Sequence, residues 1–144
     1  MSIFQDAILR FGRTIMSYAG DALFLQAAVS AAANVTVADG DVDEEEVESA
    51  IVGMRANPIL QKSYNTLRIE QELYEGIARA KTRAGRIENL RHVASIADRP
   101  IGQRQDVFLI AADVADFGGI SAVEHKALDE IAAALQVDKS ALLR

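Results

Sequence analysis

An acidic turn between two helical segments occurs twice in this chain, and this repeat constrains the fold more than any other feature. The first copy reads ADGDVDEEE at residues 38–46, and the second, longer by one residue, reads ADFGGISAVE at residues 115–124. In each copy a glycine turns the chain, and Asp43 or Ser121 then stands three residues before a glutamate. That spacing is the pattern of a capping box, which begins a helix. The repeat therefore predicts two pseudo-symmetric helix–acidic turn–helix units.

Helical periodicity runs through the rest of the sequence, and no segment alternates for long between polar and apolar residues. Apolar residues three or four positions apart form one face of a helix. The expected helices cover residues 4–18, 21–38, 43–55, 59–64, 65–84, 86–99, 100–115 and 121–135, and Asp138 caps a last turn. Together they predict a single compact all-α domain of about seven helices over residues 1–144.

Two of these segments are expected at the centre of the domain. Segment 21–38 is rich in alanine, which implies close contact with other helices. Segment 100–115 is apolar on most of its sides. The aliphatic residues of the two acidic turns, Val42 and Ile120, are expected to be buried at the corners.

Smaller features complete the expected packing. Gly85 is expected to interrupt the helical pattern between segments 65–84 and 86–99. Leu67, Ile87 and Val123 fall at the apolar positions of their helices, so we expect them to face the core.

Charge is distributed unevenly along the chain. Seven of the 21 acidic residues lie within the ten positions 39–48, where no basic residue occurs, so the other 14 nearly balance the 15 lysines and arginines. Residues 79–104 lean the other way, with seven arginines and lysines against two acids. The formal net charge of −6 makes generic nucleic-acid binding improbable. The basic stretch is expected to be solvated helix surface, with binding to an acidic partner or to the acidic corner of another copy as the alternatives.

Several classes of function are excluded or disfavoured by composition. The absence of cysteine excludes disulfides, thiolate metal sites and thiol redox chemistry. No run of about 18 apolar residues predicts a transmembrane helix, and the N-terminus lacks the pattern of a secretory signal. The two histidines, His92 and His125, are far apart and are expected at the surface, and no zinc or hydrolase motif is present. We therefore expect a cytoplasmic protein without an organic cofactor and without enzymatic activity.

The acidic turns are the candidate sites. Asp39, Asp41 and Asp43 match the first positions of an EF-hand loop, but Glu44 and Ala50 stand where its glycine and its bidentate glutamate belong. A different site for Ca²⁺ or Mg²⁺, built from carboxylates and turn carbonyls, fits better because crowded carboxylates repel one another unless a cation relieves them. The candidate ligands are Asp39, Asp41, Asp43 and Glu46 in the first turn and Asp113, Asp116 and Glu124 in the second.

Simpler interpretations remain open. Acids at a helix N-terminus are stabilised by the helix dipole and need no metal. The apolar face of the first helix, residues 4–18, is explained by packing on the core or by peripheral contact with a membrane.

The residues at 35–51 (VTVADGDVDEEEVESAI) and at 110–137 (IAADVADFGGISAVEHKALDEIAAALQV) resemble the two signature segments of the bacterial tellurite-resistance TerB family. The resemblance implies a compact helical fold with pseudo-two-fold organisation and a cytoplasmic protein that works with other tellurite-resistance proteins, including an integral membrane partner. It also implies paired acidic clusters for divalent cations, to which Asp39, Asp43, Glu46, Asp116 and Glu124 correspond. The phenylalanine at 117 departs from the family pattern, which places glycine directly after the aspartate.

These observations predict a non-enzymatic stress-response interaction module. Its acidic corners are expected to bind a divalent cation and to dock a membrane-associated partner complex at the inner face of the membrane. One alternative is an acidic docking surface that needs no metal. A less favoured alternative is a carboxylate-only, metal-dependent hydrolase.

Overall fold

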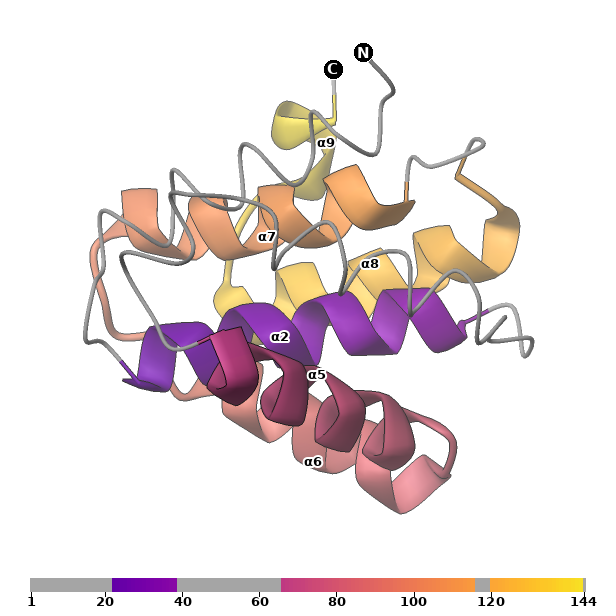
Figure 1. Ribbon diagram of the computed structural model, residues 1–144. Coiled ribbons are helices and arrows are strands. Elements are labelled where there is room, and N and C mark those ends of the chain that lie inside the picture. Colours follow the sequence, from indigo (N-terminus) through magenta and orange to yellow (C-terminus); the bar gives the residue numbers. More distant parts are fainter. Residues whose placement is uncertain (1–21, 39–65, 116–119, 144) are drawn as a thin grey trace, which may run out of the picture.

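The computed structural model describes residues 22–38, 66–115 and 120–143 (Figure 1). These residues contain helices and no strand, so the predicted all-α class is confirmed for the part of the chain that is described. The helices are α2 (Ala22–Val37), α5 (Thr66–Ala80), α6 (Arg83–Ala94), α7 (Ile101–Ala115), α8 (Ala122–Leu135) and the short α9 (Lys139–Leu142). The helices expected at 4–18, 43–55 and 59–64, and with them the pseudo-symmetry, lie outside the described residues.

Helix α2 is the centre of the described structure, as its alanine content predicts. It packs against α5, α6, α7 and α8, and in Figure 1 it runs between α7 above and α5 and α6 below. Nearly every residue from Phe24 to Val37 is buried, and Ala27, Ala28 and Ala31 are completely inaccessible. Because a methyl group is so small, neighbouring helices come close to the α2 backbone on several sides at once.

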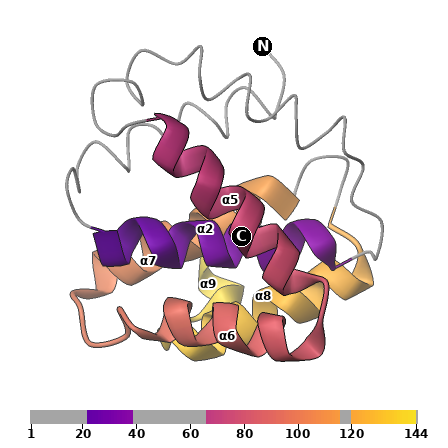
Figure 2. The same ribbon diagram turned by 60° about the horizontal axis from the view of Figure 1, so that its bottom comes forward.

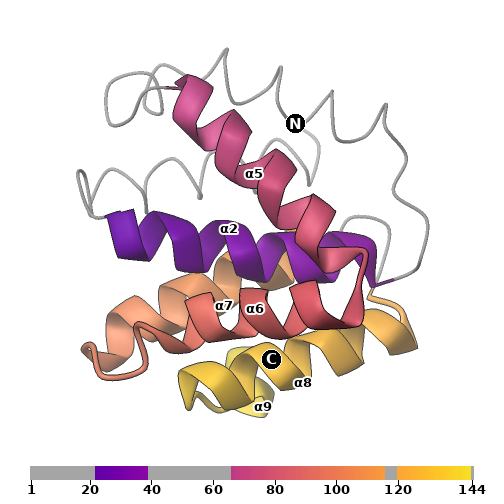
Figure 3. The same cartoon turned by 90° about the horizontal axis from the view of Figure 1, so that it is seen from below.

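The other long helices form an arc around α2. α5 packs on α6, α6 on α8, and α8 on α7. Figures 2 and 3 show that α5 crosses α2 obliquely, whereas α6 lies more nearly alongside it. The core therefore has α2 as its axis, and the large side chains that fill the space around it are Phe24, Leu25, Val93, Ile96, Phe108, Leu128, Ile131 and Leu135.

The break between α5 and α6 lies earlier than the sequence predicts. Thr82, with extended backbone, caps α6, and its Oγ accepts a hydrogen bond of 3.0 Å from the backbone N–H of Gly85. Gly85 is thus inside the first turn of α6, and the expectation that it interrupts the helices is wrong. A side chain is excluded there for a different reason: a Cβ atom on Gly85 would overlap the carbonyl group of Arg79, the last turn of α5.

Three apolar residues that were expected to face the core are exposed instead. Leu67 is 56 % accessible, Ile87 53 % and Val123 47 %. The helical spacing of apolar residues places each of the three on an apolar face. In each helix, however, a different face is the one that packs on the core. In α6, for example, the buried positions are those of Gly85, Asn89 and Val93.

Helix α7 is central only in its second half. It begins directly after Pro100, whose carbonyl accepts from the N–H of Gln103 at 3.0 Å. The first six residues are exposed or half-buried, and burial begins at Val107 and Phe108. The predicted central place of segment 100–115 is therefore met over the last two to three turns of α7, as far as its side chains are described.

Candidate functional site

The second acidic turn joins α7 to α8, and its C-terminal part is described. Ser121 caps α8: its Oγ accepts from the N–H of Glu124 at 3.2 Å, and Glu124 Oε1 accepts from the N–H of Ser121 at 3.0 Å. This reciprocal pair is the predicted capping box. Ile120 is half-buried and packs against the hydrophobic core. The sequence therefore predicts correctly how this corner is held.

The predicted ligands are only partly within the described residues. Asp39, Asp41, Asp43, Glu46 and Asp116 lie outside them, as does Val42. Asp113 lies in the last turn of α7, and the placement of its side chain is also outside what is described. Glu124 is therefore the only predicted ligand whose side chain is described.

Glu124 is half-buried at the N-terminus of α8, and Oε1 is engaged in the capping box. No described residue donates a hydrogen bond to Oε2, so that oxygen can serve a cation without disrupting the cap. Among the described residues no three His, Asp or Glu side chains gather where they could hold a metal ion. A cation at this corner would need ligands from the adjoining residues 113–119.

The capping box allows the two roles of Glu124 to be separated by substitution. In Glu124→Gln the amide oxygen still accepts from Ser121, so the free energy of unfolding should change by less than about 0.5 kcal/mol. Glu124→Ala removes the bond and should cost about 1 kcal/mol. Urea unfolding of both variants checks this expectation, and equal losses in the two would show that the carboxylate charge, not the hydrogen bond, stabilises α8.

A buried polar cluster joins α2, α5 and α6, and no local pattern in the sequence predicts it. The Nδ2 of Asn89 donates to Asn34 Oδ1 at 2.9 Å and to the carbonyl of Gly76 at 3.0 Å. Asn89 Oδ1 accepts from Arg79 Nε at 2.8 Å, and Asn34 Nδ2 donates to the carbonyl of Arg86 at 3.2 Å. Asn89 is fully inaccessible. Buried amides must be hydrogen-bonded, so this cluster fixes how the three helices meet.

Several arginines of the basic stretch have structural partners, which corrects the expectation of a simply solvated surface. Arg86 Nη1 donates to the carbonyl of Ala80 at the end of α5 at 3.1 Å. Arg104 on α7 donates through Nη1 to the carbonyls of Leu135 and Gln136, both at 3.0 Å, where α8 ends. These carbonyls have no intrahelical partner, and a cation there is also favoured by the helix dipole.

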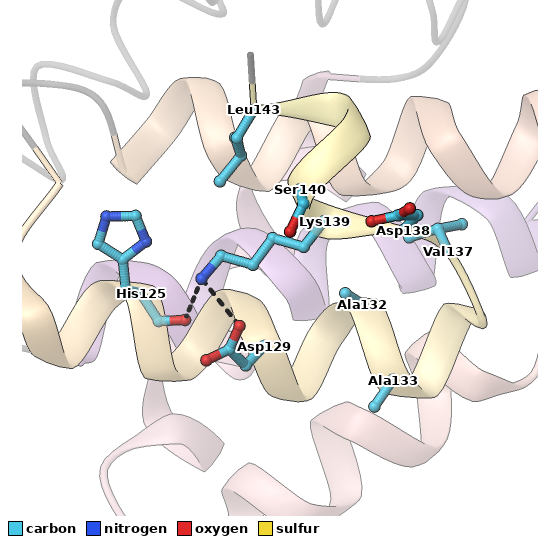
Figure 4. Close-up of a pocket in the computed structure, with 9 residues that line it drawn as sticks. All are labelled: His125, Asp129, Ala132, Ala133, Val137, Asp138, Lys139, Ser140 and Leu143. Carbon is cyan, nitrogen blue, oxygen red and sulfur yellow. Dashed lines mark hydrogen bonds and ion pairs between the residues drawn. The ribbon is translucent and has the colours of Figure 1, made fainter.

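A shallow hollow of about 590 Å³ lies between the second half of α8 and α9 (Figure 4). Lys139 bridges the two helices across this hollow: its Nζ forms an ion pair with Asp129 at 2.8 Å and donates to the carbonyl of His125 at 3.4 Å. Asp138 caps α9 as predicted, through a bond from the N–H of Ala141. These contacts hold α9 against α8, and among the described residues of the hollow they supply no activated nucleophile.

The histidines occupy the surface positions that were predicted. His125 is exposed, and His92 is partly accessible, with Nε2 3.8 Å from Glu88 Oε1 one helical turn away. The two lie on different helices, α8 and α6.

Comparison with protein-family models, curated proteins and solved structures finds no significant match to the chain. Within the described residues, no helix is both long enough and apolar enough to cross a membrane.

Proposed function

We propose that this chain is a non-enzymatic, TerB-like stress-response interaction module whose acidic turns bind Ca²⁺ or Mg²⁺ and dock a membrane-associated partner. The observation that carries the proposal is the charge distribution: seven of the ten residues at 39–48 are acidic, and the remainder of the chain is almost neutral. Helix capping explains one or two acids at such a turn, not seven. In this proposal, the partner that the chain docks is another tellurite-resistance-type protein at the inner face of the membrane.

The described structure supports this proposal at one corner. The all-helical fold and the packed, capped corner before α8 agree with the helix–acidic turn–helix units on which the resemblance rests.

A cation that binds only the folded chain should raise its melting temperature. A site with a dissociation constant of about 0.1 mM would add about 2.7 kcal/mol at about 10 mM ion. For a domain of this size that is a rise of about 5–10 °C. We expect this shift with Ca²⁺ or Mg²⁺ after chelator treatment, and its loss in the Asp39→Asn/Asp43→Asn variant, since asparagine caps a helix about as well as aspartate.

Glu75→Gln/Glu130→Gln is the matched control, because it removes two exposed carboxylates that are not part of either acidic turn in the sequence. It should keep the full shift. An absent shift with both ions in the wild-type chain would reject cation binding and leave the metal-independent acidic docking surface. That alternative predicts partner binding that weakens as ionic strength rises and does not respond to chelator.

A further inference from the structure

The outer side of α6 carries a row of basic and apolar side chains, next to one exposed acid, Glu88, whose Oε1 lies 3.8 Å from His92 Nε2. Arg83, Ile87 and Arg91 are four residues apart and so share one side of the helix. All three are exposed, and Ala84 and Ala94 beside them are exposed as well. These five residues are called the α6 outer row. The opposite side of α6 packs on α2, α5 and α8, and no described helix lies in front of α6 in the view of Figure 3.

The arginines of this row differ from the other arginines of the basic stretch. Arg79, Arg86 and Arg104 donate to acceptors within the protein. The guanidinium groups of Arg83 and Arg91, in contrast, form no hydrogen bond or ion pair with any described residue. Arg83 and Arg91 flank Ile87, a large apolar side chain that is exposed to solvent. The side chains of Ala84 and Ala94 are small, so Ile87 projects beyond them from the helix surface. Arginine next to an apolar anchor is the composition of a protein-binding surface.

We propose that the α6 outer row binds the acidic segment 39–48 of a second copy of this chain. That segment has the opposite charge and the highest charge density in the sequence, with seven carboxylates and no basic residue. It also contains Val47, an apolar residue among the acids that can cover Ile87. Each copy carries one acidic segment and one outer row, so two copies can form two reciprocal contacts and close a dimer. If the two contacts cannot form within one dimer, the copies join head to tail and give larger species at higher concentration.

Sedimentation velocity of the full chain in chelator tests this proposal independently of any cation. At about 50 mM salt we expect self-association at micromolar concentrations, and its dissociation constant should rise at least about tenfold at 500 mM salt. Arg83→Gln/Arg91→Gln should weaken association about tenfold or more at low salt. Arg68→Gln/Lys126→Gln, which removes two exposed basic charges from α5 and α8, is the matched control and should associate like the wild-type chain.

Mixing two variants identifies the occupant of the row. Glu44→Gln/Glu45→Gln/Glu48→Gln keeps the outer row and the carboxylates of the proposed cation site, and it should also be largely monomeric. Mixed with Arg83→Gln/Arg91→Gln, it should form a heterodimer, because one complete contact is restored. A wild-type chain that stays monomeric at about 1 mM at low salt overturns the proposal. Association that survives the glutamate substitutions overturns it too, since another surface would then occupy the row.

Discussion

Gly85→Ala should destabilise the fold by about 3 kcal/mol or more, although alanine is the better helix former. The added methyl group would overlap the carbonyl group of Arg79 and lie 2.6 Å from its Cα atom. Both groups are backbone, so neither can rotate away, and α6 must move relative to α5. That movement would also disturb the Asn89–Arg79 hydrogen bond. Urea unfolding followed by circular dichroism measures the loss.

Gly102→Ala is the matched control for this substitution. Gly102 lies in the first turn of α7 and has no atom within 4 Å of where its Cβ would be. The same change should therefore stabilise the protein by about 0.5–1 kcal/mol through helix propensity. If both alanines stabilise the chain, the close approach of α5 to α6 is not as described.

Asn89→Ala should cost about 3 kcal/mol. It removes the partners of the Asn34 carboxamide oxygen, the Gly76 carbonyl and the Arg79 guanidinium in an environment that water does not reach. Each buried polar group left without a partner costs about 1–3 kcal/mol. The cavity left by the lost carboxamide group adds to this cost. Urea unfolding measures the change at constant m-value.

Two comparisons make this prediction specific. Gln71→Ala removes an exposed amide from α5 and should change the free energy of unfolding by no more than about 0.5 kcal/mol. The double variant Asn34→Ala/Asn89→Ala should lose less than the sum of the single variants by about 1 kcal/mol, because the two amides are direct partners. Additive losses would show that Asn34 and Asn89 stabilise the helices independently.

Local signals in the sequence predict the described fold well where they act over a few residues. The Ser121–Glu124 capping box and the cap at Asp138 both follow from pairs of residues close in sequence, and Pro100 directly precedes α7 as predicted. The helix before Pro100, in contrast, was expected to run to residue 99, and α6 ends five residues earlier, at Ala94. The alanine content of α2 predicts its central place for a similar reason, because small side chains allow neighbouring helices to approach the backbone closely.

Features that depend on distant contacts could not be predicted in this way. Gly85 was predicted to break the helix, whereas Thr82 caps α6 and Gly85 lies inside its first turn, against the backbone of Arg79. Ile87 matches an apolar spacing, yet α6 turns Asn89 inward instead, because that amide has partners on α2 and α5. For the candidate site, Glu124 is placed as its capping pattern predicts. Its use as a ligand depends on neighbours that no local pattern specifies.

The alanines of α2 have a consequence for how this sequence can change over evolutionary time. Ala27, Ala28, Ala31 and Ala33 have no accessible surface, and helices pack around them on several sides. A larger residue at any of these positions requires a smaller side chain on a neighbouring helix to make room for it, and two such changes rarely arise together. Exposed positions such as those on the outside of α5 and α8 are under no such constraint. Chains that descend from a common ancestor with this fold should therefore diverge first on their surfaces and last along α2, which becomes the segment by which distant relatives can still be aligned.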